Sequence, residues 1–399
     1  MVVNFASKIA LVAPFGLCAK GTSRARVVPL AKALAARGHR VTVFIPPYDC
    51  PADSGRRIRE DGVDISNVIL PALAGNHPGP GHVSLGVRLA RSVNHWGPDV
   101  VHTFKPKGPS GLAAALMWGR ARRGALVVDS DDWEGGGGWN DDPRVGYPAV
   151  ARRIFAWQES FGLSHADAWT VTSTCLKSRA VGFGADAERV VHLPNAVPGD
   201  ALAVRVTRRP EPNTVLLYTR FAGVQVADVA EIWSQLRERI PDARLLVVGR
   251  GPAAEEVELA GLPGVTCAGW VSPAELPEWF SRSAVAILPW TDTPANRARH
   301  SAKLLELMAA GAPIVAVSVG EIPATLGEAG VLVATGDAGA FASAVAGVLG
   351  DPARQANMSQ AARERVAAEF TWDKLVDRAL AAYDLALAHR NHAGRGKPS

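Results

Sequence analysis

Short apolar runs alternate with longer amphipathic stretches through the first half of the chain. Lys8–Ala13 has the pattern of a buried strand, and the stretch after it keeps apolar residues on one helical face up to Gly38, where a helix would commonly end. The next strand, Arg40–Ile45, alternates Val and Ile with other residues. Further strands are expected at Asp99–His102, Ala125–Asp129, Ala168–Thr172 and Arg189–Leu193. Strands that alternate with helices are typical of a parallel sheet covered on both faces.

The same alternation begins again after Pro198–Asn213, a polar stretch that contains prolines. A helix is expected around Val226–Ile240, and two long helical patterns end the chain. The expected strands and final helices are Thr214–Thr219, Arg244–Val248, Val265–Ala268, Ala284–Leu288, Ile314–Ala316, Val331–Val333, Ala353–Glu369 and Trp372–Ala388. We therefore predict an α/β protein with two Rossmann-like domains, residues 1–199 and 200–371, facing each other across a cleft that holds the site. The polar residues 390–399 are expected to fray.

Composition narrows the class of partner. Apolar residues make up 48% and charged residues 20% of the chain, an ordinary balance for a globular protein. The net charge of +5 would suit an acidic partner, but the arginines occur in small groups, such as Arg152 and Arg153. No stripe of basic residues interleaved with aromatic ones is present, so a nucleic-acid partner is not expected.

The four cysteines, Cys18, Cys50, Cys175 and Cys267, are far apart, and none forms a CxxC pair. We therefore predict neither a zinc site nor a disulfide framework, and a reducing compartment. The first seven residues lack the pattern of a signal peptide, and the apolar runs are shorter than a membrane span. The expectation is a soluble, cytoplasmic protein.

A set of motifs gives a more specific indication. The segment Lys303–Ala316 reads KLLELMAAGAPIVA, with Glu306 within the helical part and Gly311 and Pro313 before the next strand. This segment resembles the signature helix and following strand of glycosyltransferase family 4. Other fragments resemble that family in the same order: Gly38–Val43, Pro98–His102, Ala166–Ser173, Leu193–Asn195, Val248–Pro252 and Gly269–Val271.

The resemblance implies the GT-B fold, a nucleotide-sugar donor held mainly by the C-terminal half, and a final helix, within 372–399, that packs back on the N-terminal domain. It implies that Glu306 accepts hydrogen bonds from the ribose hydroxyls, since a carboxylate offers two acceptor oxygens to a vicinal diol. Donor phosphates would lie at a helix N-terminus, and Arg220 would bind the diphosphate. The implied phosphate and base contacts are His300, Ser301 and Ala302, then Gly251, Gly269, Trp270 and Val271.

The chain departs from the family pattern at three places. Ala298 stands where the first of two glutamates is common, Gln225 and Val226 stand where a lysine often follows the arginine, and Gly320–Ala324 replaces a Gly-Gly-Ile-Pro-Glu run. Lys303, Arg297 or Arg299 would then supply the positive charge at the leaving diphosphate. Asn296 would replace the missing sugar contact.

An acidic run, Asp129–Glu134, follows one of the N-terminal strands and precedes four glycines, Gly135–Gly138. Acids so close together are costly unless they are solvated or bind something. Asp131 stands where the family often has a histidine, so Asp131 or Asp132 is a candidate acceptor-orienting group or general base. A divalent cation is the alternative, but the family generally uses no catalytic metal, so none is expected. The glycines indicate a mobile loop that could serve as a lid.

Two further features lie in the N-terminal half. The loop with Gly16, Gly21 and Thr22 is expected to approach the donor phosphates or the acceptor, although its glycines do not match a dinucleotide fingerprint. His102 ends a strand, and the favoured interpretation is a structural histidine, with a site role as the alternative.

We therefore predict a glycosyltransferase that moves a sugar from a nucleoside-diphosphate sugar to an acceptor hydroxyl, with retention implied by the resemblance. The alternatives are a non-catalytic nucleotide-sugar-binding subunit and a nucleotide-sugar epimerase of the same fold. A helix through Val83, Leu85, Val87 and Leu89 carries Arg88, Arg91 and His95. Peripheral contact with an anionic membrane is one interpretation of this face, and an ordinary covering helix is the other.

Overall fold

The computed structural model describes residues 6–18, 21–72, 79–120, 123–202 and 210–395. The chain divides into two compact units: unit 1 is Met1–Asn195 with Trp372–Ser399, and unit 2 is Ala196–Thr371. The sequence placed the boundary between residues 199 and 200, and in the structure a bridge between Val197 and Thr371 holds the start of the connecting segment on unit 2.

Unit 1 contains an eight-stranded sheet with the order β3-β4-β2-β1-β5-β6-β7-β8. All neighbouring strands are parallel except the β3–β4 pair. The strands are β1 Lys8–Val12, β2 Arg40–Ile45, β3 Arg57–Glu60, β4 Val63–Asn67, β5 Val100–Phe104, β6 Ala125–Ser130, β7 Ala168–Val171 and β8 Val190–His192. The helices are α1 Val28–Ala36, α2 Pro80–Trp96, α3 Gly108–Trp118, α4 Ala149–Ser164, α5 Thr174–Gly182 and α14 Trp372–Arg395.

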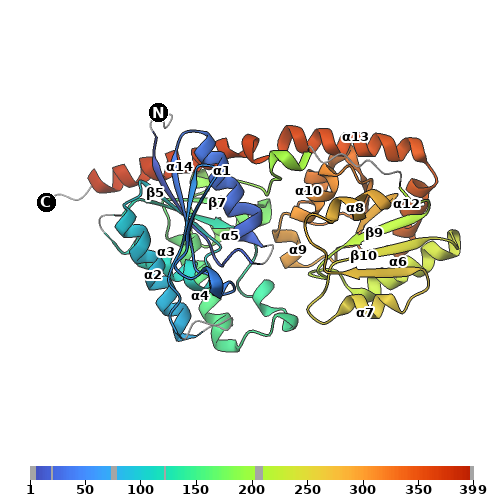
Figure 1. Cartoon of the computed structure of the whole chain (residues 1–399), viewed down its shortest axis with the longest axis horizontal. Helices are drawn as coiled ribbons and strands as arrows, with labels where there is room; N and C mark the ends of the chain where they lie inside the picture. Colours follow the sequence, from blue (N-terminus) through green and yellow to red (C-terminus); the bar gives the residue numbers. More distant parts are fainter. Residues whose placement is uncertain (1–5, 19–20, 73–78, 121–122, 203–209, 396–399) are drawn as a thin grey trace. The chain divides into compact units, whose positions relative to one another are not determined.

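Unit 2 contains a fully parallel six-stranded sheet with the order β11-β10-β9-β12-β13-β14 (Figure 1). The strands are β9 Thr214–Tyr218, β10 Arg244–Val248, β11 Val265–Gly269, β12 Val285–Leu288, β13 Ile314–Val317 and β14 Val331–Val333. The helices are α6 Val226–Arg239, α7 Glu255–Ala260, α8 Leu276–Arg282, α9 Pro294–Ala298, α10 Ala302–Ala309, α11 Ile322–Leu326, α12 Ala338–Leu349 and α13 Pro352–Glu369.

The core of unit 2 lies on both faces of its sheet. Val215 and Leu217 of β9 belong to a cluster with α6 and α12, whereas Leu216 belongs to a cluster with α10 and α13. Successive side chains of a strand point to opposite faces, so a strand that is apolar at every position must be covered on both sides. Two helix-covered, mainly parallel sheets confirm the predicted α/β class.

Helix α14 belongs to unit 1, where it packs against α1 and against β6, β7 and β8 (Figure 1). Its apolar face is buried through Leu375, Val376, Ala379, Ala382 and Tyr383. Fraying was expected from Arg390 onward, but α14 continues to Arg395, so the expected end of the helix lies too early in the sequence. Among the residues that the structure describes, no helix combines the length and apolar character that a membrane crossing needs.

The prediction that the cysteines form no disulfide is wrong. Cys18 and Cys50 form a disulfide with Cα atoms 5.6 Å apart, while Cys175 and Cys267 remain thiols. Cys18 follows β1 and Cys50 follows β2, and these strands are parallel neighbours. The loops after adjacent parallel strands meet at one edge of the sheet, so the fold brings together two cysteines that are 32 positions apart in the sequence.

Candidate functional site

In each unit the strand order reverses at one point, and such points are where open parallel sheets bind ligands. In unit 1 the chain proceeds outward from β1 to β2 and β4, then returns to the other side of β1 as β5. In unit 2 it proceeds from β9 through β10 to β11 and returns beside β9 as β12. The loops after β1 and β5, and after β9 and β12, therefore form the two candidate regions.

In unit 1 the loop after β1 reaches the acidic run that follows β6. The hydroxyl of Thr22 donates to Asp131 Oδ2 at 2.6 Å. Thr22 immediately precedes a short π-helical turn, Ser23–Val27, a form of helix that is often found at functional sites. Gly16 donates its backbone N–H to Asp49 Oδ1 at 2.6 Å, next to the Cys18–Cys50 bond. The structure thus brings together two predicted residues, Thr22 and Asp131, from distant parts of the chain.

Lys105 lies at the centre of the acidic run. Its Nζ atom is 3.3 Å from Asp131 Oδ1 and 3.0 Å from Glu134 Oε1, and it also contacts Asp132. Lys107 contacts the second oxygen of Glu134 at 3.0 Å. Two ammonium groups from the loop after β5 therefore neutralise these acids, which reduces the repulsion between the carboxylates. A divalent cation at this place would have to compete with Lys105.

The charged groups of this cluster change one another's pKa values. Burial by itself would raise the pKa of Glu134, but Lys105 and Lys107 hold it down to about 2. Burial raises the pKa of Asp132 against the opposing charge of Lys105. Burial likewise opposes the charge of Lys105, yet its carboxylate neighbours hold its pKa well above the usual value. Asp132 is therefore the carboxylate of the cluster whose affinity for a proton is increased, as a general base requires.

Asp129 and His102 belong to a different, fully buried network. Arg26 forms a two-pronged ion pair with Asp129, at 2.9 and 2.6 Å, and the Thr170 hydroxyl donates to Asp129 Oδ2 at 2.6 Å. The ring nitrogens of His102 lie 3.0 Å from Thr170 Oγ1 and 2.9 Å from the hydroxyl of Tyr383. Burial lowers the pKa of His102 well below its usual value. A neutral histidine with both nitrogens occupied fits the structural interpretation.

The glycine run after the acids is folded into a closed turn. The carboxylate of Glu159 accepts the backbone N–H groups of Glu134 and Gly135 at 2.8 and 3.0 Å. Gly138 donates to the carbonyl of Gly135 at 2.8 Å, and Trp139 donates to that of Trp133 at 2.7 Å. These bonds argue against the mobile lid that the sequence suggested.

In unit 2 three residues meet after β9. The Tyr218 hydroxyl donates to Glu306 Oε2 at 3.0 Å, and Lys303 Nζ lies 4.9 Å from the centre of the Tyr218 ring. Burial, followed by the charge of Glu306, raises the pKa of Tyr218. Arg220, two positions beyond the end of β9, is exposed, and it is close enough for its charge to oppose this rise. Glu306, Lys303 and Arg220 are therefore gathered at the carboxyl end of the central strand.

The N-terminus of α10 carries the predicted phosphate contacts. Ser301 is the N-cap, and its Oγ accepts the backbone N–H of Leu304 at 3.1 Å. The N–H groups of Ala302 and Lys303, in the first turn, lie at the positive end of the helix dipole. His300 is buried and lies against Thr325, with Nε2 3.0 Å from Oγ1.

The predicted base-pocket residues follow β10 and β11. Gly251 is buried and donates its N–H to Glu256 Oε2 at 2.9 Å. Gly269 ends β11 with a φ of 65°, and Trp270 after it is 63% exposed. Val271 packs against the core. An indole that remains exposed beside a strand end is available for stacking on a flat ligand.

Asn296 and the arginines beside it have other partners. The Asn296 amide donates to the carbonyls of Gly223 at 2.9 Å and Thr291 at 2.6 Å. Arg299 contacts Asn296 Oδ1 and lies 4.2 Å over the ring of Trp290, while Arg297 binds Asp292 at 2.7 Å. Ala298 is completely buried. Asn296 thus clamps the loops after β9 and β12, and Lys303 is the cation that lies beside Glu306.

Several site residues were missed by sequence reasoning. Lys105 and Lys107 neutralise Glu134, a member of the predicted acidic run in unit 1, and Tyr218 holds Glu306 in unit 2. A signal was available for the lysines, because Lys-Pro-Lys follows β5 directly and the acids follow β6, its neighbour. Tyr218 carried no such signal.

Comparison with known proteins gives consistent matches over both units. A family model for the "Glycosyl transferase 4-like domain" matches residues 21–196, and one for "Glycosyl transferases group 1" matches residues 212–351. The GDP-mannose-dependent alpha-(1-6)-phosphatidylinositol monomannoside mannosyltransferase of Mycobacterium tuberculosis (strain H37Rv) is 28% identical over 373 residues, which cover 87% of this chain and 90% of that protein.

Two solved structures share the fold. Sucrose-phosphate synthase from Thermosynechococcus elongatus has a TM-score of 0.71 at 23% identity, with 96% of this chain and 99% of that chain covered. HepE of Anabaena, solved in complex with UDP-glucose, has a TM-score of 0.64 at 15% identity, with 94% and 99% covered. At these identities the likeness concerns the fold.

Proposed function

This chain belongs to glycosyltransferase family 4, and we propose that it transfers a glycosyl group from a nucleoside-diphosphate sugar to an acceptor hydroxyl, with retention of anomeric configuration. The observation that carries the proposal is the group formed by Tyr218, Glu306 and Lys303 at the end of β9, beside the N-terminus of α10. A vicinal diol, a diphosphate and a developing negative charge are the chemical features that such a group can bind.

On the donor side, Glu306 would accept the ribose hydroxyls, and Tyr218 would fix the orientation of the carboxylate through its 3.0 Å hydrogen bond. The backbone N–H groups at the start of α10 would bind the diphosphate. Lys303 and Arg220 would stabilise the charge that grows on the leaving phosphate as the bond to the sugar breaks. Gly251, Gly269 and Trp270 would line the base pocket. No step in this scheme requires a metal ion.

On the acceptor side, the proposal assigns the acceptor hydroxyl to the cluster in unit 1. Asp132 is its proposed orienting group or base, because burial raises its pKa while Lys105 holds it in place. Thr22 would fix Asp131 through the 2.6 Å bond. His102 takes no part, since both of its ring nitrogens already have partners. In a retaining reaction the leaving phosphate itself would assist removal of the acceptor proton.

The two alternatives make different predictions for one assay. An epimerase would convert the donor sugar without any acceptor, and a non-catalytic subunit would bind the donor and leave it intact. A transferase would release the nucleoside diphosphate slowly in water and rapidly once a suitable acceptor is present. Product stereochemistry, measured by nuclear magnetic resonance on the transferred sugar, tests retention.

The first experiment is thermal unfolding of the purified protein with ADP, GDP, UDP, GDP-mannose and UDP-glucose. A bound ligand at about 100 times its Kd should stabilise the protein by about 2.7 kcal/mol. Glu306→Ala should abolish the shift for the preferred nucleotide, whereas Glu238→Ala, an exposed glutamate on α6, should leave it unchanged. If no nucleotide shifts the unfolding temperature, or if both variants behave alike, the donor site is wrongly assigned.

A further inference from the structure

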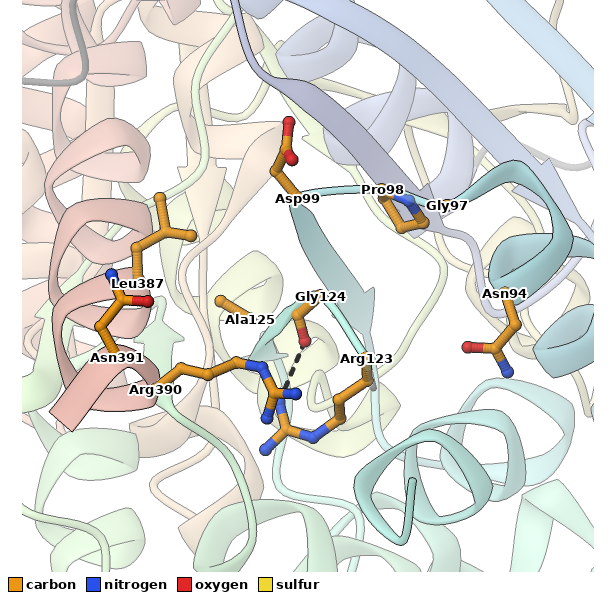
Figure 2. Close-up of a pocket in the computed structure, with 10 residues that line it drawn as sticks. All are labelled: Asn94, Gly97, Pro98, Asp99, Arg123, Gly124, Ala125, Leu387, Arg390 and Asn391. Atoms are coloured by element: carbon orange, nitrogen blue, oxygen red, sulfur yellow. Dashed lines mark hydrogen bonds between the residues drawn. The ribbon is translucent and has the colours of Figure 1, made fainter. Parts of the chain in front are cut away.

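Unit 1 contains a pocket at the amino ends of β5 and β6, the ends opposite to the Lys105 cluster. The pocket has a volume of about 380 Å³. Asp99 and Gly124 come from the amino ends of β5 and β6, Asn94 comes from α2, and Arg390 and Asn391 come from α14 (Figure 2). The Lys105 cluster lies at the carboxyl ends of the same two strands, so the two places are separated by the length of the sheet.

Arg123 forms the floor of this pocket and is held rigidly. Its side chain is 5% exposed; it forms an ion pair with Asp167 through both terminal nitrogens, and Nη1 also donates to the carbonyl of Gly124 at 3.0 Å. The guanidinium carbon lies 4.4 Å from the centre of the Trp118 ring. Its Nε atom is buried and has no hydrogen-bond partner.

A second guanidinium lies against the first. Figure 2 shows the head groups of Arg123 and Arg390 together at the base of the pocket. Burial, and then the charge of Arg123, lowers the pKa of Arg390, while Asp167 acts in the opposite direction. Asp167 is already occupied, since it accepts the Leu126 N–H at 2.7 Å and lies 3.3 Å from His389 Nδ1. Asp167 therefore lies beside both guanidinium groups, and Asp99 is the second carboxylate that lines the pocket.

The walls of the pocket are fixed in shape. A Cβ atom on Gly124 would lie 2.6 Å from the carbonyl oxygen of Pro98 and 2.9 Å from that of Asp99. Only glycine therefore allows the segments that lead into β5 and β6 to approach this closely. Asp99 Oδ2 accepts the backbone N–H of Lys8 at 2.8 Å, and this bond orients its carboxylate. Asn94 and Asn391 add amide groups on opposite sides.

We propose that this pocket binds a small phosphomonoester that carries hydroxyl groups, such as a sugar phosphate, with the phosphate between Arg123 and Arg390. Two guanidinium groups that lie together match the geometry of phosphate oxygens. The Asp99 carboxylate and the amides of Asn94 and Asn391 are suited to hydroxyl groups. The volume is that of a small-ligand site. Because the pocket lies at the amino ends of β5 and β6 and the Lys105 cluster lies at their carboxyl ends, its occupant is neither the donor nor the acceptor of the transfer reaction.

Isothermal titration calorimetry of the full chain with glucose 6-phosphate tests the proposal, with glucose as the uncharged comparison. The wild type should bind the phosphomonoester at one site and should not bind glucose. Arg390→Gln should weaken binding at least about tenfold, which corresponds to about 1.4 kcal/mol. Lys374→Gln, which removes the same charge from an exposed position on the same helix, should leave the affinity unchanged.

Two controls distinguish this pocket from the donor site and from a general loss of stability. The Glu306→Ala variant should bind the phosphomonoester as the wild type does, because the proposed pocket is not the donor site. Without ligand, the unfolding temperature of Arg390→Gln is compared with that of the wild type, so that a loss of binding can be separated from a loss of stability. Absence of binding, or binding that survives in Arg390→Gln but is lost in Glu306→Ala, would overturn the proposal.

Discussion

Glu134 is almost completely buried, and its two carboxylate oxygens contact Lys105 and Lys107 at 3.0 Å each. These contacts hold its pKa at about 2, against an ordinary value of 4.5. A group whose pKa is lower in the folded than in the unfolded protein stabilises the fold above the unfolded-state pKa. That contribution is lost as the pH falls from about 4.5 towards 2.

Glu134→Gln should therefore destabilise the protein most at neutral pH. The pKa difference corresponds to about 3 kcal/mol at pH 7, and the gap between wild type and variant should narrow steadily below about pH 4.5. Urea denaturation at pH 7, 4 and 3 measures the free energy of unfolding of both proteins. Glu238→Gln, an exposed substitution, should show a small effect that does not depend on pH. An equal loss at every pH would mean that packing, not charge, gives Glu134 its role.

At this scale the sequence predicted residue types better than partners. It selected Asp131, Asp132 and Glu306, because acids after a strand or within a family motif are visible in one dimension. It did not predict that Lys105 would neutralise the acids, nor that Tyr218 would orient Glu306, since these contacts join residues 27 and 88 positions apart. Such pairings depend on the order of strands, which no local pattern contains.

The passage from β10 into its loop depends on a single glycine. Gly249 has a φ of 122°, and a Cβ atom there would lie 1.7 Å from the carbonyl oxygen of Thr219. The Gly249 N–H also donates to the carbonyl of Gly269 at 2.7 Å, so the residue joins the loops after β9, β10 and β11. These are the loops to which the base pocket is assigned.

Gly249→Ala should cost about 3 kcal/mol or more, because the clash is with backbone and adds to an unfavourable φ. Gly336→Ala is the matched control: its φ is 77°, but nothing lies within 4 Å of the added carbon. That variant should lose only the conformational part, about 1 kcal/mol. Chemical denaturation of both variants gives the comparison, and equal losses would show that the close approach to Thr219 is relaxed in solution.

The Cys18–Cys50 bond joins the loop after β1 to the loop after β2 and closes a segment that contains α1 and β2, with a sequence separation of 32. In the loop-entropy model a closure of this size contributes about 3–4 kcal/mol. Cys18→Ser should lower the free energy of unfolding by that amount under oxidising conditions and by little in the presence of a thiol reductant. Cys175→Ser, at a cysteine outside the disulfide, should leave the response to reductant unchanged. A wild type that is insensitive to reductant would contradict the role assigned to this bond.

Among the elements, the strands that the sequence predicted begin and end within two residues of the observed ones, as for Arg244–Val248 and β10. Strands β3 and β4 were missed: the exposed segment Arg57–Glu60 has no apolar periodicity, whereas Val63 and Ile65 of β4 do alternate with polar residues. Their connection did carry a signal. Asp61 and Gly62, both with positive φ, form a two-residue Asp-Gly turn of the kind that joins the two strands of a β-hairpin.

Across the whole molecule, consecutive helices belong to different cores. Val366 of α13 is fully buried in unit 2, in the cluster with α10, and Val376 of α14 is fully buried in unit 1. The two valines are ten positions apart in the sequence. They offer the same chemistry and the same burial on the two sides of the boundary at Thr371.

Val366→Ala and Val376→Ala should each cost about 1–3 kcal/mol, since each leaves a cavity of similar size in a packed core. If the units unfold as separate cooperative bodies, differential scanning calorimetry will show two transitions, and each variant will lower the temperature of a different one. Glucose 6-phosphate should then raise only the transition that Val376→Ala lowers, and a nucleotide only the one that Val366→Ala lowers. A single transition that both variants shift equally would mean that the units unfold together. In that case ligand-induced shifts could not be assigned to one unit, and calorimetric titration of the variants would be needed to distinguish the sites.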